Sequence, residues 1–432
     1  MPNTPSASSP PSSGFTADDG TISRQQWKWS ALAGMASYLD AGSIVALGAG
    51  LALFQSYLNL SNGAIGVLAA IGPNALGCAI GAIGGGWLGD KLGRKFIYQY
   101  DLMVYAAGIL CIALALNPAM LFIGTFVVGV AVGVDVPTSL ALVGELAPAK
   151  ARGKLLGFTQ VAWCLGPVIV LWLAVLLAPL GMLGIRIIFL HLFLVAVVTW
   201  AMRRGLAESV RWKEASKAAG AAGSKVKALF SGSNLRAMIW TATIYLFWNL
   251  AAGTAGIFNP YFISKLNAGS QAASVGLSSA GFIIAMVVTL TVFMRFSDRS
   301  YGTRRLLWGI GALMQVTAYA LFLFLPFTIP VIVTNILLFS AGGALAGEAF
   351  YKVFSQELFP TLLRGTAQGF TFGIARTILG IWSFFVPLLA SAGIGEVAAL
   401  LTVFLAISGV VGFVFMPDTS GKSLEQIELE RA

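Results

Sequence analysis

Charged side chains are scarce in this sequence. Asp, Glu, Lys and Arg together make up 10% of its 432 residues, whereas hydrophobic residues make up 57%. Water-soluble globular domains carry roughly 25% charged residues, so this chain has too little charge for a water-exposed surface of its size. The composition therefore excludes an ordinary soluble protein and indicates one that lies mostly in lipid.

Histidine and cysteine are also rare. The chain has one histidine, His191, and three cysteines, Cys78, Cys111 and Cys164, all within apolar runs. The cysteines lack the spacing of a metal site or a disulfide framework, no convergent catalytic set is visible, and no channel filter motif is present. We therefore expect neither an enzyme nor a channel, with no cofactor and no metal site, and we expect His191 to be a packing residue.

What the chain has in abundance is long apolar runs. Backbone amides in hydrocarbon must be bonded within their own segment, so such runs form helices, and about 20 residues suffice to cross a bilayer. We therefore predict an all-α membrane protein with twelve transmembrane helices. The expected spans are residues 29–56, 63–88, 97–116, 119–144, 155–180, 183–202, 236–264, 273–295, 304–325, 328–356, 366–391 and 394–416.

The charged turns between these runs occur twice. Segment 86–95 (GWLGDKLGRK) has a weaker copy in 295–304 (RFSDRSYGTR), which places Asp298 opposite Asp90 at an offset of 208 (298 − 90). A second element, with Glu145 and Arg152, returns with Glu357 and Arg364 at an offset of 212 (357 − 145). Repeated halves of this kind are how many secondary transporters are built.

The repeat predicts the organisation of the chain. We expect two pseudo-symmetric six-helix bundles at 29–204 and 235–416, related by an approximate two-fold axis along the membrane normal. A central loop at 205–234 joins them, and its mixture of charge with Ala and Val favours short amphipathic helices. The tail 1–28 opens with residues rich in Ser, Pro and Thr and reads as disordered, and a second tail spans 417–432.

Lys and Arg gather in alternate turns. They crowd the turns after the second and fourth spans and the central loop, whereas the opposite turns are nearly free of them. The positive-inside rule therefore puts both termini and the central loop in the cytoplasm, as for a multi-pass protein of a bacterial inner membrane. This placement accounts for the net charge of +10 more simply than nucleic-acid binding does, because no single basic face is formed.

Several motifs carry a family resemblance. The turn at 86–95 resembles the signature loop between the second and third helices of the major facilitator superfamily. Three further elements together resemble the sugar-porter branch: Glu145 to Gly153 with its copy, 208–212 (ESVRW) and 417–427 (PDTSGKSLEQI). Segment 29–54 is most similar to bacterial inositol-transporter-type carriers. The resemblance implies the major facilitator fold, secondary transport by alternating access, and a monomer.

The repeated turns suggest a conformational latch. In the family, the Asp of the first turn lies at helix ends, and the Arg bonds nearby carboxylates and carbonyls. A carboxylate at a helix N-terminus gains up to about 1 kcal/mol from the helix dipole. The alternative is that these charges only mark turns and fix topology. The latch residues that we predict are Asp90, Arg94, Glu145, Arg152, Asp298, Glu357 and Arg364.

Charges deep inside spans indicate function, because an ionised group at the membrane centre costs roughly 2.5–3.5 kcal/mol on insertion scales. The resemblance implies proton coupling at Asp40, since an acid near this position couples protons in sugar-porter symporters. Asp135 and Glu348 are the reserve candidates. The alternative is structural pairing, of Glu348 with Lys352 and of Arg376 with Asp40 or Asp135.

The chain also departs from the family pattern. An Arg is common early in the fourth span of proton-coupled members, and this sequence has Thr125 there. The paired glutamines of the seventh span are replaced by Phe247 and Trp248, while Gln160 of the fifth span is retained. Recognition of a hexose by the usual amides is therefore doubtful, and Asp135 and Arg376 are the candidates to replace the missing charge partner.

Two classes of substrate remain open. A polyol or sugar, with inositol favoured, would bond to Gln160, Asn249 and Asn335 and stack on Trp248. An organic anion or aromatic acid would use Lys352 and Arg376 instead. We expect a secondary active transporter of a small polar metabolite that works as a proton symporter. An efflux carrier of the same fold is the closest competitor, because the direction of transport follows the coupling gradient.

Overall fold

A computed structural model describes residues 20–206, 208–219, 226–265, 271–326, 328–392 and 394–431. Within these ranges the chain forms helices and turns and contains no strand. Ten of the described helical segments are long and apolar enough to cross a membrane by length and composition. Helices α9 and α15, of 34 and 29 residues, complete the twelve. The predicted fold class is confirmed.

The first half of the chain forms six membrane-crossing segments, the second of them made of two helices. They are α1 (Arg24–Tyr57), α2 (Asn62–Ile71) with α3 (Leu76–Leu92), α4 (Arg94–Ala113), α5 (Pro118–Leu146), α6 (Arg152–Leu177) and α7 (Met182–Arg203). The expected tail 1–28 lies largely outside the described residues, and α1 begins within it because Ser23 and Gln26 form a capping box.

The second half repeats this pattern. Its segments are α9 (Gly232–Lys265), α10 (Gln271–Val288) with the π-helix η5 (Thr289–Phe293) and α11 (Met294–Phe296), α12 (Tyr301–Phe324), α13 (Ile329–Leu345) with α14 (Glu348–Glu357), α15 (Arg364–Ala392) and α16 (Ile394–Val414). The second segment of the chain is broken between Ile71 and Leu76, and the tenth between Leu345 and Glu348. Broken helices of this kind expose backbone groups that line binding sites in many transporters.

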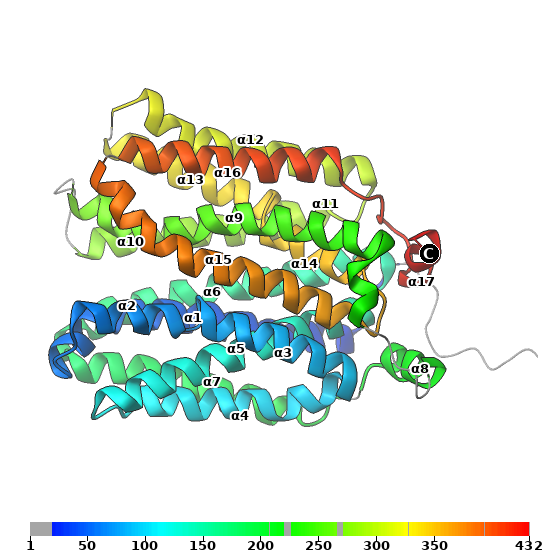
Figure 1. Cartoon of the computed structure of the whole chain (residues 1–432), viewed down its shortest axis with the longest axis horizontal. Coiled ribbons are helices and arrows are strands. Elements are labelled where there is room, and N and C mark those ends of the chain that lie inside the picture. Colours follow the sequence, from blue (N-terminus) through cyan, green and yellow to red (C-terminus); the bar gives the residue numbers. More distant parts are fainter. Residues whose placement is uncertain are drawn as a thin grey trace, which may run out of the picture.

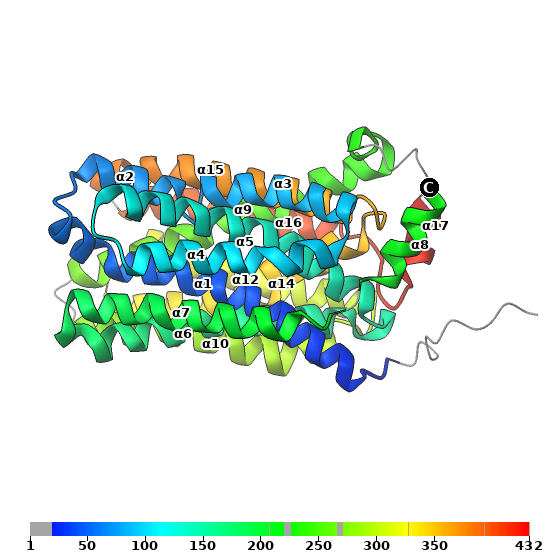
Figure 2. The ribbon, with the colours of Figure 1, turned by 90° about the horizontal axis from the view of Figure 1, so that it is seen from below.

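The two halves lie side by side along two seams. In Figures 1 and 2, α3 runs beside α15, and α6 runs beside α10, and these pairs are in contact. Helix α8 (Val210–Ala219) of the central loop and the C-terminal helix α17 (Leu424–Arg431) sit together at one end, where Arg211 and Glu425 form a 3.3 Å ion pair. We call this end the α8/α17 end.

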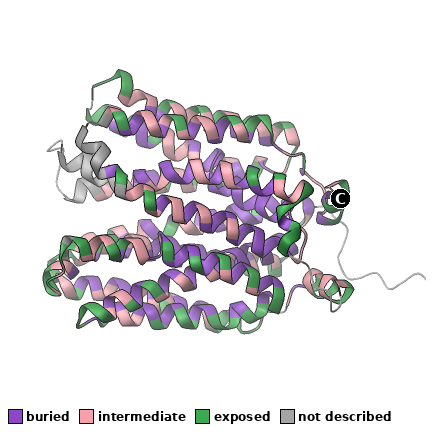
Figure 3. Cartoon of the chain, in the orientation of Figure 1, coloured by how far each residue is buried: buried purple, intermediate pink, exposed green. Residues whose placement is uncertain are grey.

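Burial follows the pattern expected in lipid. Figure 3 shows buried residues where helices face one another and exposed residues along the outside. Large apolar side chains stand on that outer surface, among them Leu176, Leu313 and Phe324, which are 70%, 68% and 82% exposed. An apolar surface of this extent is suited to a partner that is itself apolar, here the hydrocarbon of the bilayer.

Glycines on α3 permit close packing of the backbones. A Cβ built on Gly81 would lie 2.1 Å from the carbonyl oxygen of Val130 on α5, and one on Gly86 would lie 2.1 Å from the carbonyl oxygen of Gly365 on α15. Helix α3 therefore touches α5 within its own half and α15 across the seam. Small residues are the usual means by which membrane helices approach this closely.

We predict that Gly81→Leu separates α3 from α5 and destabilises the fold, because overpacking a tight contact costs about 1–3 kcal/mol or more. The thermal unfolding midpoint in detergent should fall by about 5 °C or more. The matched control is Gly84→Leu on the same helix, since nothing lies within 4 Å of a Cβ at Gly84. Equal loss of stability in both variants would contradict this explanation.

Candidate functional site

At the α8/α17 end, each half caps a helix of the other half. Asp90, at the end of α3, accepts hydrogen bonds from the backbone N–H groups of Gly365 and Thr366, at 3.1 and 2.6 Å, and from the Thr366 hydroxyl at 2.7 Å. Its charge therefore meets the N-terminus of α15, where a carboxylate is stabilised by unpaired N–H groups and by the helix dipole.

The second half makes the same kind of interaction with the first half. Asp298, between α11 and α12, accepts hydrogen bonds from the backbone N–H groups of Gly153 and Lys154, both at 2.8 Å, at the N-terminus of α6. Burial raises the pKa of the Asp298 carboxyl above its ordinary value, against the opposing effects of Arg304 and of these two N–H groups. Acidification therefore weakens this contact by removing the charge that holds it.

Glu145 joins the halves at the seam of α3 and α15. Its Oε1 accepts hydrogen bonds from Arg94 at 2.8 Å and from Arg364 at 3.2 Å. Arg94 also donates to Asp90 at 2.7 Å and to the carbonyl of Thr361, on the second half, at 2.8 Å. All of these charged side chains are buried. Glu145 thus shares two guanidinium groups, one from each half.

Glu357 likewise joins the two halves, at the seam of α6 and α10. It accepts hydrogen bonds from Arg304 at 2.7 Å and from Arg152 at 3.1 Å. Sequence reasoning left Arg304 out of the latch set. The reason is spacing: four positions separate Asp90 from Arg94, whereas six separate Asp298 from Arg304. At a fixed offset the copy of Arg94 falls on Gly302, and only the folded turn brings Arg304 to the carboxylates.

A second group of charges lies deeper, between the halves. Oδ2 of Asp40 on α1 accepts a hydrogen bond from Nε1 of Trp163 at 3.2 Å, and Arg376 on α15 approaches it to 3.7 Å. Arg376 also donates to Oδ1 of Asn74 at 2.6 Å, at the break before α3. Oδ1 of Asp40 is buried without a hydrogen-bond partner among the described residues. Neither Asn74 nor Trp163 was singled out from the sequence.

Three further polar side chains meet where α6 of the first half faces α14 of the second half. Nζ of Lys352 donates to Oε1 of Gln160 at 2.6 Å and lies 3.5 Å from Glu348. Nε2 of Gln160 in turn donates to Oε2 of Glu348 at 3.4 Å. Glu348 is the first residue of α14, directly after the break in the tenth segment. The predicted Glu348–Lys352 pair is therefore present, and it reaches the first half through Gln160.

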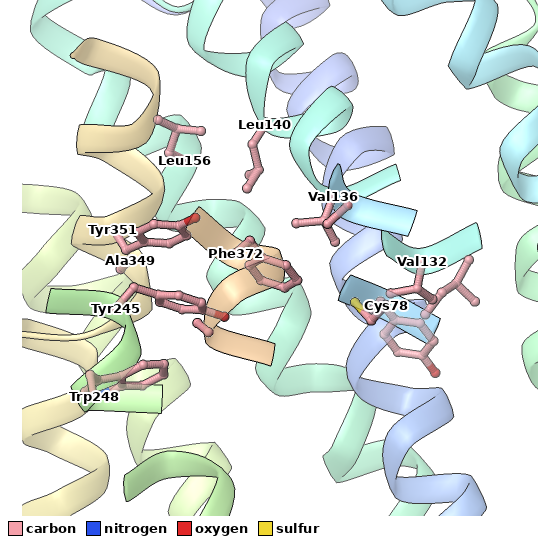
Figure 4. Close-up of a cluster of buried hydrophobic side chains, with 14 of the residues drawn as sticks. Cys78, Val132, Val136, Leu140, Leu156, Tyr245, Trp248, Ala349, Tyr351 and Phe372 are labelled. Carbon is pink, nitrogen blue, oxygen red and sulfur yellow. The ribbon is translucent and has the colours of Figure 1, made fainter. Parts of the chain in front are cut away.

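Aromatic rings cover one side of this region. Figure 4 shows Tyr351, Tyr245 and Trp248 one beyond another, with Phe372 beside Tyr245. Tyr245 stacks on Tyr351 with centroids 4.0 Å apart and on Phe372 at 5.4 Å, and Phe372 lies 4.8 Å below the guanidinium of Arg376. The stack of rings therefore ends in contact with Arg376, the partner of Asp40.

Two amides predicted to bind substrate differ in their surroundings. Asn249 donates to the Tyr245 hydroxyl at 3.4 Å, and its Oδ1 is buried without a partner among the described residues, as is Nε1 of Trp248. Asn335 lies at the contact of α12 with α13, where it donates to the carbonyl of Ala318 at 2.7 Å. Asn249 and Trp248 therefore have polar atoms to offer, whereas Asn335 serves a helix–helix contact.

Asp135 sits within the first half and not beside Arg376. Its Oδ2 lies 3.0 Å from Arg203, its Oδ1 accepts a hydrogen bond from Ser139, and Arg203 also approaches Asp101 to 3.4 Å. Arg203 further donates to the carbonyl of Leu32 on α1 at 2.8 Å. The missing charge partner of Asp40 is thus supplied by Arg376, and Asp135 belongs to a separate cluster of α4, α5 and α7.

Two repeated halves, joined by reciprocal charges at one end and enclosing a polar set between them, define a membrane carrier. Residues 30–381 match the model of the Major Facilitator Superfamily. The chain belongs to this superfamily and is a membrane transporter, as its relatives are, and not an enzyme.

The relatives of this chain include sugar and polyol carriers and also carriers of organic acids, such as the cis,cis-muconate transport protein of Acinetobacter baylyi, 26% identical over 92% of this chain and 96% of that one. The chain is 39% identical over 407 residues to the minor myo-inositol transporter IolF of Bacillus subtilis, with 92% of each chain covered. It is 25% identical to the glucose transporter GlcP of Staphylococcus epidermidis, over 82% of this chain and 86% of that one. The proton:xylose symporter XylE of E. coli has the same fold, with a TM-score of 0.83 at 18% identity over 94% and 99% of the two chains. The sugar-porter resemblance is confirmed.

We predict that Asp90→Asn slows turnover by roughly tenfold or more while equilibrium substrate binding changes little. Hydrogen bonds to a charged group contribute about 1.5–3 kcal/mol, and about 1.4 kcal/mol shifts an equilibrium tenfold. Transport by proteoliposomes and binding in detergent would separate the two effects. Asp418→Asn, at an acid whose side chain is 52% exposed at the same end, is the control. A normal transport rate in Asp90→Asn would remove the latch assignment.

Proposed function

We propose that this transporter moves a neutral polyol, inositol or a related sugar, together with a proton, by alternating access. The observation that carries the proposal is the polar set between the halves, made of Asp40, Arg376, Glu348, Lys352 and Gln160. It contains two acids and two bases in contact with one another across the two halves. Such a set has no net charge to offer an ionic substrate.

This balance supports a polyol over an anion. Lys352 is held by Gln160 and Glu348, and Arg376 by Asn74 and Asp40. An anion would have to displace a buried carboxylate from its cation, which leaves an uncompensated charge at a cost of several kcal/mol. Hydroxyl groups both donate and accept, so a polyol can join these contacts without separating the charges. The likeness to IolF points the same way.

An organic anion or aromatic acid is the alternative substrate. Two cations at this depth favour it, and Nε of Arg376 is buried without a hydrogen-bond partner among the described residues. Gln160, Asn249 and Trp248 are the proposed binding groups for a polyol, and Lys352 and Arg376 for an anion. Asn335, predicted from the sequence to bind substrate, is the least supported of the proposed binding residues. Its amide already donates a hydrogen bond to a carbonyl on α12.

The latch supports alternating access. Its members Asp90, Arg94, Glu145, Arg152, Asp298, Glu357 and Arg364, joined by Arg304, bond across both seams at the α8/α17 end. The Lys and Arg distribution supports a cytoplasmic location for this end. The bundles 29–204 and 235–416 are then rocking units that close the cytoplasmic side while these contacts hold. We further propose a monomer in a bacterial inner membrane with both termini cytoplasmic, importing rather than exporting substrate.

Proton coupling is proposed at Asp40. Its Oδ2 faces Trp163 and Arg376, and its Oδ1 is free to take a proton. Protonation removes the charge that attracts Arg376, so proton binding and the position of α15 relative to α1 are linked. Glu348 is a reserve candidate because it belongs to the same polar set. Asp135 is a weaker reserve, since Arg203 neutralises it within one half.

We predict that Asp40→Asn abolishes accumulation of substrate under an imposed pH gradient and leaves exchange of substrate largely intact. Asparagine cannot bind and release a proton, whereas its size and its acceptor oxygen are preserved. Labelled myo-inositol in proteoliposomes would measure both activities. Asp418→Asn, at an exposed acid outside the polar set, is the control. If Asp40→Asn still concentrates substrate, the role passes to Glu348 or Asp135, and failure of all three substitutions to alter accumulation would indicate a uniporter.

We predict that Gln160→Ala raises the KM for a polyol by about tenfold or more, because it removes both a binding amide and the link between Lys352 and Glu348. Asn335→Ala, at the least supported binding residue, should raise the KM much less, because its amide already donates to the carbonyl of Ala318. A panel of myo-inositol, a hexose and a dicarboxylate tests the substrate class. Uptake of the dicarboxylate in preference to both neutral compounds would overturn the polyol proposal in favour of the anion.

A further inference from the structure

A cavity of about 490 Å³ opens at the α8/α17 end of the seam between α6 and the segment formed by α10, η5 and α11. Four cations line it, Lys150, Lys154, Arg295 and Arg299, and Leu290 and Met294 form an apolar wall. Neither the latch nor the central polar set uses these four side chains.

The four cations come as two pairs from opposite halves. Lys150, just before α6, is four residues from Lys154 in its first turn. Arg295, on α11, is four residues from Arg299 in the turn that follows α11. None of the four forms a salt bridge within the described part of the chain. Lys154 and Arg299 rest over the rings of Trp27 and Phe296, at 5.7 and 4.3 Å, which orients the charges without neutralising them.

The acid that lines the cavity does not compensate them either. Asp298 accepts its hydrogen bonds from the backbone N–H groups of Gly153 and Lys154 and pairs with Arg304 at 3.3 Å. Its charge is therefore committed to the helix end and to a buried guanidinium. Among the described residues, these four exposed like charges face one space across the seam, which favours an anion there.

The other seam shows that the latch does not require these cations. The same offsets of 212 and 208 place Leu362, Thr366, Trp87 and Lys91 at the four corresponding positions. Asp90 caps α15 there as Asp298 caps α6 here, yet only one of the four is a cation. The basic set is thus an addition to one seam and not part of the repeated motif.

The wall of the cavity points to an amphipathic anion. Leu290, on η5, is 42% exposed and faces outward from the helix bundle, whereas Met294 is buried. A free phosphate ion gains nothing from such a wall. A phospholipid gains at both ends, because its phosphate meets the cations and its acyl chain lies along Leu290. Basic pockets between membrane helices on the cytoplasmic side suit anionic headgroups.

We propose that this cavity binds the phosphate headgroup of an anionic phospholipid and that the bound lipid stabilises the state in which the α8/α17 end is closed. Each half supplies one pair of cations, so the complete site exists only while α6 and α10 remain together. A ligand that binds one state alone shifts the population toward that state.

The test uses the full chain in nanodiscs, with spin labels at Gln99 on α4 and Leu306 on α12, in a background without the native cysteines. Both positions are exposed near the α8/α17 end and lie outside the cavity. Pure phosphatidylcholine is compared with a mixture of about one part phosphatidylglycerol to three parts phosphatidylcholine. We expect the ratio of closed to open molecules to rise about tenfold in the mixture, from several cation–phosphate contacts of moderate strength.

Two double variants locate the effect. Lys150→Gln with Lys154→Gln, and Arg295→Gln with Arg299→Gln, should each abolish the response to phosphatidylglycerol, because a bridging site needs both pairs. The matched control, Lys91→Gln with Lys95→Gln at the other seam, should respond as the wild type does. A wild-type response in both double variants, or an equal loss in the control, would overturn the proposal. So would full reproduction of the effect by inorganic phosphate in pure phosphatidylcholine, since the ligand would then be a free anion.

Discussion

The structure depends on charges that are buried in pairs between its two halves. At the α8/α17 end four carboxylates face four guanidinium groups, and each aspartate also caps a helix that belongs to the opposite half. An isolated charge in this environment is costly, so the pairs hold only as a complete set. Because the ion pairs join the two halves, separating the halves leaves buried charges unpaired. The free-energy cost of these unpaired charges therefore opposes separation of the halves. That constraint is the basis of our proposal that the charged turns act as a latch.

The same rule of balance organises the central set. Two acids and two bases meet between the halves, with Gln160 and Asn74 supplying the amide contacts that complete them. The cluster of Asp101, Asp135 and Arg203 departs from this balance, since two carboxyl groups share one guanidinium. It lies within one half, however, so its charge is unaffected when the halves move. Charge that crosses the seam can report on conformation, and charge confined to one half stabilises a bundle.

Much of this charged network could be predicted from the sequence, because the two halves repeat the same charged turns at nearly constant offsets. The repeated turns predicted seven latch residues, six of them paired at the offsets of 208 and 212, and all seven take part in contacts across the seams or in the ion pairs that support them. Arg304 was missed because its turn is two residues longer than the turn with Arg94. Asn74 and Trp163 were missed because no charge, repeat or family motif marks either position in the sequence. Their importance arises from proximity to Asp40 and Arg376, which only the folded chain creates.

The latch and the polar set are mechanically connected through single helices. Helix α15 carries Arg364 at its N-terminus, within the latch, and Arg376 beside Asp40, twelve positions further along. Helix α14 begins with Glu348, in the polar set, and ends with Glu357, in the latch. Each of these helices is a continuous hydrogen-bonded rod, so a change of partner at one end of the helix shifts the side chains at its other end. The breaks before α3 and α14 allow each inner helix to tilt without disturbing the outer part of its segment, since a missing backbone hydrogen bond is where a helix bends. In the proposed mechanism, substrate and proton therefore need only alter the contacts of Arg376 and Glu348 to change the stability of the latch.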